Sequence, residues 1–198
     1  MKTPQSIHTI VLINQDICPK ITADQLKFRT LFLESEAPAS AWREAVRAAI
    51  KEGASRFFMI GLGQPTQLSE KLDGIVITDQ INVSGQNPLV GPNDENFGPR
   101  FPDLSGLYDP DLAQDLIKAG QNAGLILRKG LLLVTVEKTV TTALEEKIIG
   151  QNEIAATSQD IFAGAIVAKH AGKQCAGLIL FSGISGNGLR RLIAGLDR

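Results

Sequence analysis

Short apolar runs alternate with helical segments along most of the chain, and this alternation limits the possible folds more than any other feature. Each run is rich in Val, Ile, Leu or Phe and too short for a buried helix, so each is predicted as a strand. The predicted strands are residues 7–13, 28–33, 56–60, 75–78, 131–136, 153–157 and 176–181. The predicted helices are residues 39–52, 110–123, 141–149, 160–171 and 187–196. The alternation indicates an α/β fold around a largely parallel sheet.

The helix ends carry recognisable signals. Pro38 precedes the first predicted helix, with Ser40 expected as its cap, and Gly53 is expected to end it. The length of 198 residues suits one compact domain, so we expect a single domain over residues 1–198.

Composition argues against several classes of partner. With 20 Lys and Arg against 21 Asp and Glu, and 5% aromatic residues, the chain is not expected to bind nucleic acid. No run approaches the ~18 apolar residues of a membrane span, and the polar start does not resemble a signal peptide. Cys18 and Cys175 are expected as core thiols in a reducing compartment, and two histidines are too few for a histidine-rich metal site. We expect a cytoplasmic protein without metal or membrane association.

Residues 80–109 interrupt the alternation. The segment contains four prolines and four glycines, which predicts an irregular loop throughout. Its large apolar and aromatic side chains favour burial against this subunit or a neighbour rather than disorder. They are Leu89, Phe97, Phe101, Leu104, Leu107 and Tyr108.

The same segment is the most specific motif of the chain. Residues 79–109 read DQINVSGQNPLVGPNDENFGPRFPDLSGLYD. This closely resembles the long loop of trimeric purine nucleoside phosphorylases, with its DHIN…G-x-NPL-x-GPND…FG-x-RFP…S…YD pattern. Gln80 stands where the family has His, and AIVAKHAG at residues 165–172 resembles the family's VARHxG stretch.

The resemblance implies a single α/β domain with a mixed, largely parallel sheet, assembled as a trimer. It also implies phosphorolysis, in which phosphate displaces a purine from C1′ of ribose to give free base and ribose 1-phosphate. Phosphate is then a co-substrate, and no cofactor is implied. The matching interface positions are Asn87, Pro88, Gly91, Pro92, Asn93, Phe97 and Phe101. Phe101 matches a Phe that reaches the neighbouring subunit's nucleoside site; simple packing in the interface is its alternative role.

The phosphate-binding positions of the family are mostly changed. The GSGLG loop becomes residues 14–18, with no glycine and with Asp16, whose charge would repel a dianion. The Q-G-R-x-H loop becomes a loop that holds Glu34 and Glu36, which we expect to be solvated. The TNAAGG turn keeps Gly61 and Gly63, as an anion-binding turn or a plain turn.

The family's M-S pair, a ribose contact and a phosphate ligand, matches Thr157 and Ser158. Ser158 is thus the one phosphate-type side chain that is kept, although a serine at a strand end is common on any fold. His170 lies at a predicted helix end, where an interaction with the helix dipole is favoured over catalysis.

The base-contacting positions are changed as well. The Glu of the family's G-P-S-F-E-T stretch becomes Thr139; Glu137 could replace it only in a rebuilt loop, and a surface ion pair with Lys138 is its other role. The Asn of I-T-N becomes Gly183, which opens a glycine-rich turn that could bind an anion at a helix N-terminus or merely connect two elements. The family also carries a ribose-contacting His on a later segment, and with the sequence ending at Arg198 we expect no full equivalent of it.

Three readings follow. The favoured one is a degenerate homologue that keeps the fold and trimer-forming loop, has no catalytic residues, and binds a small ligand or acts as a scaffold. The second is a divergent phosphorylase or nucleosidase acting on purine nucleosides through Glu137, Ser158 and Phe101. The third is a regulatory subunit that inserts into trimers of an active relative. Under the first, the partners are other copies of the chain and, as ligand, a purine nucleoside or base.

Overall fold

The computed structural model of the chain describes residues 9–34, 37–66, 71–136 and 142–196. The described residues form eight strands, five α-helices and two short 3-10 helices. The strands are β1 (Thr9–Asn14), β2 (Arg29–Leu33), β3 (Arg56–Leu62), β4 (Gln64–Pro65), β5 (Gly74–Asn82), β6 (Leu127–Val134), β7 (Ile154–Ser158) and β8 (Gln174–Leu180). The helices are α1 (Ala39–Lys51), α2 (Pro110–Ala123), α3 (Ala143–Gln151), α4 (Phe162–His170) and α5 (Gly186–Ala194), with η1 (Gln15–Ile17) and η2 (Ala23–Gln25).

The strands form one mixed, largely parallel sheet in the order β2-β1-β3-β8-β5-β6-β7-β4. The strands β2, β1, β3 and β8 run parallel, as do β5, β6 and β7 among themselves, while β5 pairs antiparallel with β8. The short β4 follows β3 in the chain and pairs antiparallel with β7, so this part of the sheet curls back on itself. The curl brings the ends of β3 and β7 together, although they are far apart in sequence.

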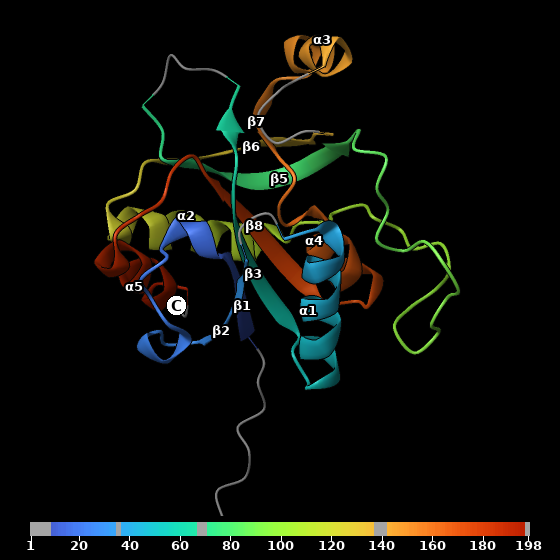
Figure 1. The fold of residues 1–198 in the computed structure, drawn as a ribbon, viewed down its shortest axis with the longest axis horizontal. Coiled ribbons are helices and arrows are strands. Elements are labelled where there is room, and N and C mark those ends of the chain that lie inside the picture. Colours follow the sequence, from blue (N-terminus) through green and yellow to red (C-terminus); the bar gives the residue numbers. More distant parts are fainter. Residues whose placement is uncertain (1–8, 35–36, 67–70, 137–141, 197–198) are drawn as a thin grey trace, which may run out of the picture.

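Helices cover both faces of the sheet (Figure 1). The helices α1 and α4 pack with one hydrophobic cluster, which includes Trp42, Phe57 and Phe162. The helices α2 and α5 pack with a second cluster on the other face, which includes Phe58, Leu116 and Leu192. The central strands are buried on both faces, as their continuous apolar runs predict. The predicted fold class is confirmed.

The predicted elements are all present, with ends shifted by a few residues, and three details differ. Ser40 does not cap α1: Pro38 is the N-cap residue and no side chain bonds there. Residues 80–82 are not irregular but end β5, because β6 supplies backbone partners as far as Val134. Asp160 precedes α4 instead of beginning it, because Ile161 adopts a positive φ of 62° and the helix starts at Phe162.

The long loop is only partly buried. Leu107 and Tyr108 are buried and Leu89 and Phe97 half-buried, as expected from their apolar character. Phe101, however, is 88% exposed and Leu104 is 38% exposed. Both cysteines are buried, as predicted.

Candidate functional site

The carboxyl ends of three strands meet at one point of the sheet. Asn14 ends β1, Leu62 ends β3 and Ser158 ends β7. These are the positions that match the family's phosphate loop, its glycine turn and its phosphate-binding Ser. The fold therefore brings together the segments that the resemblance assigned to phosphate.

The centre of this meeting point is the carboxylate of Asp160, which is 2% exposed. Its Oδ2 accepts hydrogen bonds from Asn14 Nδ2 at 2.6 Å and from the backbone N of Leu62 at 3.0 Å. Asp160 lies two residues before the start of α4 at Phe162, and its side chain does not cap that helix. We call Asn14, Leu62, Ser158 and Asp160 the strand-end network.

The hydroxyl of Ser158 is used inside this network. It donates to the carbonyl oxygen of Leu62 at 2.5 Å and accepts from the backbone N of Asp160 at 3.0 Å. Ser158 is 3% exposed and the neighbouring Thr157 is 5% exposed. In this arrangement the proton of the Ser158 hydroxyl is not free to donate to an anion.

Gly61 and Gly63 are required by packing. A Cβ on Gly63 would lie 2.3 Å from the carbonyl oxygen of Thr157, and one on Gly61 would lie 2.6 Å from the Cβ of Asp160. Both distances are too short for real atoms, because the β3–β4 connection crosses close to β7. Close approach of the chain to itself explains both glycines without a bound anion.

Only some of the other predicted anion and base positions lie among the described residues. Asp16 and Glu34 are exposed, whereas Glu36, Glu137 and Thr139 lie outside the described residues. The turn at Gly183 packs on the first connection of the chain, since the backbone N of Ile184 donates to the carbonyl oxygen of Ile17 at 2.9 Å. Ser185 caps α5 by accepting from Gly188 N at 3.1 Å, which satisfies one donor of that N-terminus with a side chain of the same turn.

The long loop is tied to α1 and α4. The ring of Phe97 lies 4.6 Å from the guanidinium of Arg47 on α1. The Nε2 of His170, at the end of α4, forms a hydrogen bond of 3.0 Å with the carbonyl oxygen of Pro99, and Lys169 Nζ donates to Gly106 O at 3.1 Å. His170 thus lies at the helix end as predicted and holds the loop.

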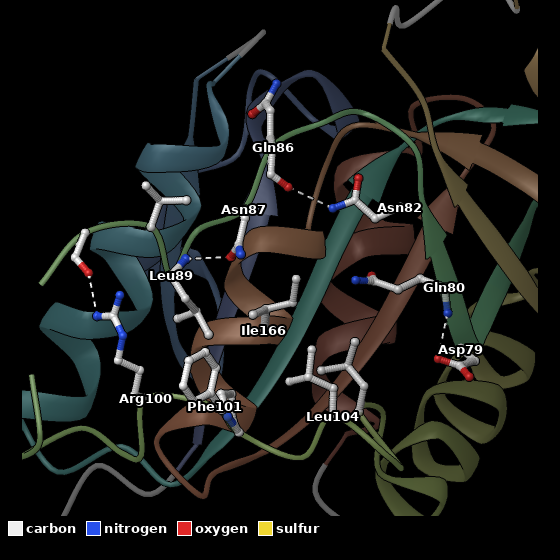
Figure 2. Close-up of a pocket in the computed structure, with 14 residues that line it drawn as sticks. Asp79, Gln80, Asn82, Gln86, Asn87, Leu89, Arg100, Phe101, Leu104 and Ile166 are labelled. Carbon is white, nitrogen blue, oxygen red and sulfur yellow. Dashed lines mark hydrogen bonds between the residues drawn. The ribbon is translucent and has the colours of Figure 1, made fainter. Parts of the chain in front are cut away.

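A pocket of about 650 Å³ opens between this loop, the end of β5 and α4 (Figure 2). Its apolar lining includes Leu107 and Ile166, and Figure 2 shows the amides of Gln80 and Asn87 directed toward it. Phe101 stands at its edge. The pocket has the size of small-molecule sites in proteins.

Two titratable groups, Tyr108 and Asp109, lie at the end of the long loop, directly before α2. Burial raises the pKa of Tyr108 well above its usual value, and its hydroxyl donates to Gln80 Oε1 at 2.7 Å. Burial alone would raise the pKa of Asp109, but hydrogen bonds from Leu112 N, Gln174 and Asp111 N outweigh it and lower the pKa. Asp109 is the N-cap residue of α2.

Within the described ranges there is no cluster of three or more His, Cys, Asp or Glu residues able to hold a metal ion. In the same part of the chain, no helix has the length and apolar character needed to cross a membrane.

Sequence reasoning missed Asn14 and Asp160. The signal for Asn14 is a polar residue that directly ends an apolar strand. The signal for Asp160 is a carboxylate between a strand end and a helix. Polar residues in such places meet at the carboxyl edge of a parallel sheet, which is where sites form.

Comparison with known proteins agrees with this architecture. The model of the Phosphorylase superfamily matches residues 36–190. Purine nucleoside phosphorylase 1 of Bacillus subtilis is 34% identical over 110 residues, which cover 56% of this chain and 41% of the relative. Purine nucleoside phosphorylase of Rattus norvegicus is 35% identical over 115 residues, or 56% of this chain and 40% of the relative. The chain therefore aligns with about two fifths of the length of these relatives.

Solved structures show the same fold. Schistosoma mansoni purine nucleoside phosphorylase in complex with acetate superposes with a TM-score of 0.76 at 18% identity, over 98% of this chain and 88% of that one. The inosine complex from the same organism gives 0.74 at 17% identity, over 98% and 86%. With the family model matching most of its length, the chain belongs to the phosphorylase superfamily.

Proposed function

We propose that this protein is a purine nucleoside phosphorylase-like homologue that keeps the fold and the loop but does not catalyse phosphorolysis. The observation that carries this proposal is the strand-end network, in which Asp160 and Ser158 bond to the protein itself. A phosphate dianion placed there would lie beside a buried carboxylate, and like charges at short range oppose binding.

This arrangement should greatly reduce transition-state stabilisation for phosphorolysis. Phosphorolysis needs a bound phosphate and donors that stabilise the charge developing on the departing purine. Loss of a single charge-stabilising donor costs about 2.7–4 kcal/mol of transition-state stabilisation. Here Ser158 is internally bonded and the base-contacting Asn is replaced by Gly183, so several such contributions are absent together.

The proposal includes assembly as a homo-trimer through the long loop. Phe101 is 88% exposed and Val90 is 76% exposed, although hydrogen bonds tie the loop to the body. Exposed apolar side chains that gather beside a pocket are typical of surfaces that meet a partner. A purine nucleoside or base is the proposed small ligand, and the pocket has room for a molecule of that size.

Two coarser features belong to the same proposal. Residues 1–198 form one domain, which the packing of both hydrophobic clusters on a single sheet supports. The protein acts in the cytoplasm, where its buried free thiols would stay reduced.

Cleavage of inosine and guanosine, measured with and without phosphate, tests the proposal. We expect no phosphate-dependent release of base. Robust phosphate-dependent turnover that Ser158→Ala abolishes would overturn the proposal. Cleavage that proceeds equally well without phosphate would support the alternative of a divergent nucleosidase.

A further inference from the structure

We propose that the strand-end network is a small-oxyanion socket whose built-in occupant is the side chain of Asp160. When that side chain is shortened, the socket takes up a free carboxylate in its place. This inference rests on the proposed function, because it assumes that phosphate does not occupy the strand ends.

The donors of the socket are held independently of Asp160. Asn14 and Leu62 lie 146 and 98 residues away from it in sequence and belong to neighbouring strands of the sheet. The amide of Asn14 is oriented from its other side, since its Oδ1 accepts from the backbone N of Asp16 at 2.9 Å. Both donors therefore keep their positions when the carboxylate is removed.

The bonds recorded to the carboxylate come from neutral groups. Within the described residues, Asp160 forms no ion pair with a basic side chain. An amide N–H and a backbone N–H hold a single negative charge, and hydrogen bonds of this kind to an ionised acceptor are strong. The next residue, Ile161, adopts a positive φ of 62°, which is rare for a β-branched residue, and Asp160 itself is 2% exposed.

The space at the socket sets the size of the ligand. The Cβ of Asp160 lies so close to Gly61 that a methyl group on that glycine would be 2.6 Å away. The Asp160→Ala variant would thus free only the volume of a carboxylate group. Formate has that volume, acetate is larger, and phosphate is larger and more highly charged.

Thermal unfolding of the full chain tests the inference, with sodium chloride replaced by formate, acetate or phosphate at constant ionic strength. We expect Asp160→Ala to have a lower Tm than the native protein. Formate should raise the Tm of this variant by roughly 5–10 °C at concentrations ~100-fold above its dissociation constant. Acetate should act more weakly, and the native protein should show no formate-specific response.

Two controls make the result specific. Asp109→Ala removes a carboxylate that accepts two backbone N–H groups at a solvent-exposed helix end. Formate should not restore the Tm of this variant. The double variant Asn14→Ala/Asp160→Ala lacks one donor of the socket and should lose most of the formate effect. If Asp160→Ala does not fold, the yield of folded protein on refolding in formate against chloride replaces the Tm.

A Tm of Asp160→Ala that responds equally to formate and chloride would overturn the inference, as would stabilisation by phosphate but not by formate. Either result leaves the proposed function standing if the native protein is inactive. Phosphorolysis by the native protein would instead overturn the proposed function, whatever formate does to the variant.

Discussion

The strand ends and the long loop differ in opposite ways from what their sequences predict. The strand ends have lost most of the residues of the resemblance, yet their described polar groups bond to one another and are buried. The loop keeps nearly all of its motif, yet it leaves Phe101 and Val90 in solvent. The polar groups of the changed region bond to one another, whereas the kept region leaves apolar side chains exposed that the proposed trimer would cover.

Physical constraints account for the difference. A buried polar group must be hydrogen-bonded, so strand ends without a ligand are stable only when they satisfy each other. An exposed loop can carry single apolar side chains without consequence. Several such side chains kept together on one loop indicate a surface that a partner covers. Four variants test this contrast, ordered by the expected loss of folding stability.

The largest effect is expected for Gly63→Ala at the strand ends. The new Cβ would lie 2.3 Å from the carbonyl oxygen of Thr157, so β4 and β7 would have to separate. We expect a loss of about 3 kcal/mol or more in the free energy of unfolding, measured with urea. Gly150→Ala on helix α3 is the control, because its new Cβ would meet nothing within 4 Å. We expect its free energy of unfolding to rise by roughly 0.5–1 kcal/mol. Equal free energies of unfolding for the two variants would show that β4 and β7 do not approach each other closely at Gly63.

The next effect is expected for Asn14→Ala, which removes the 2.6 Å hydrogen bond to Asp160. A buried carboxylate left without one of its donors should cost about 2–3 kcal/mol of stability. Chemical denaturation checks this value, and the double variant with Asp160→Ala separates the bond from other effects of the alanine. Independent, additive losses in that cycle would mean that the two side chains do not interact.

A smaller, pH-dependent effect is expected for Asp109→Ala at the end of the loop. The cap bonds to Asp111 and Leu112 are lost, which should cost about 1 kcal/mol near pH 7. Because the pKa of Asp109 is lowered in the folded state, its contribution is present above its ordinary value of 3.8 and is lost as the pH falls through the lowered value. Denaturation series at pH 7 and below pH 3 should therefore show a difference that shrinks in acid. A difference that grows in acid would contradict this assignment.

The smallest effect on folding is expected for Phe101→Ser, since the ring is 88% exposed. The free energy of unfolding of the isolated subunit should change by no more than about 0.5 kcal/mol. If the protein assembles as proposed, analytical ultracentrifugation should instead show loss of the proposed trimer. Leu144→Ser on α3 is the matched control, because Leu144 is also exposed, at 63%, but lies outside the loop. Native protein that sediments as a monomer would remove the basis for assembly through this loop.

Much of the fold could be predicted from the sequence, because strand and helix periodicities are local. The helix predicted over residues 110–123 is α2, with Pro110 in its first turn and Gly124 as its C-cap. The end of β5 could not be predicted, because the backbone partners of residues 80–82 are residues 132–134 of β6.

The site was less predictable, because its contacts also join residues that are far apart in the sequence. Ser158 was identified, but its bonding depends on Leu62 and Asp160, which reach it only through the curl of the sheet. The pairing of Asn14 with Asp160 joins residues 146 positions apart, and no spacing rule signals it.

The most direct measurement is a crystal structure of the native protein grown in a high concentration of phosphate. We expect Asp160 Oδ2 to stay within hydrogen-bonding distance of Asn14 Nδ2 and Leu62 N, with Ser158 bonded to Leu62 O and no phosphate among them. Phosphate bound at the strand ends, with the hydroxyl of Ser158 turned toward it and Asp160 displaced, would overturn the proposed function.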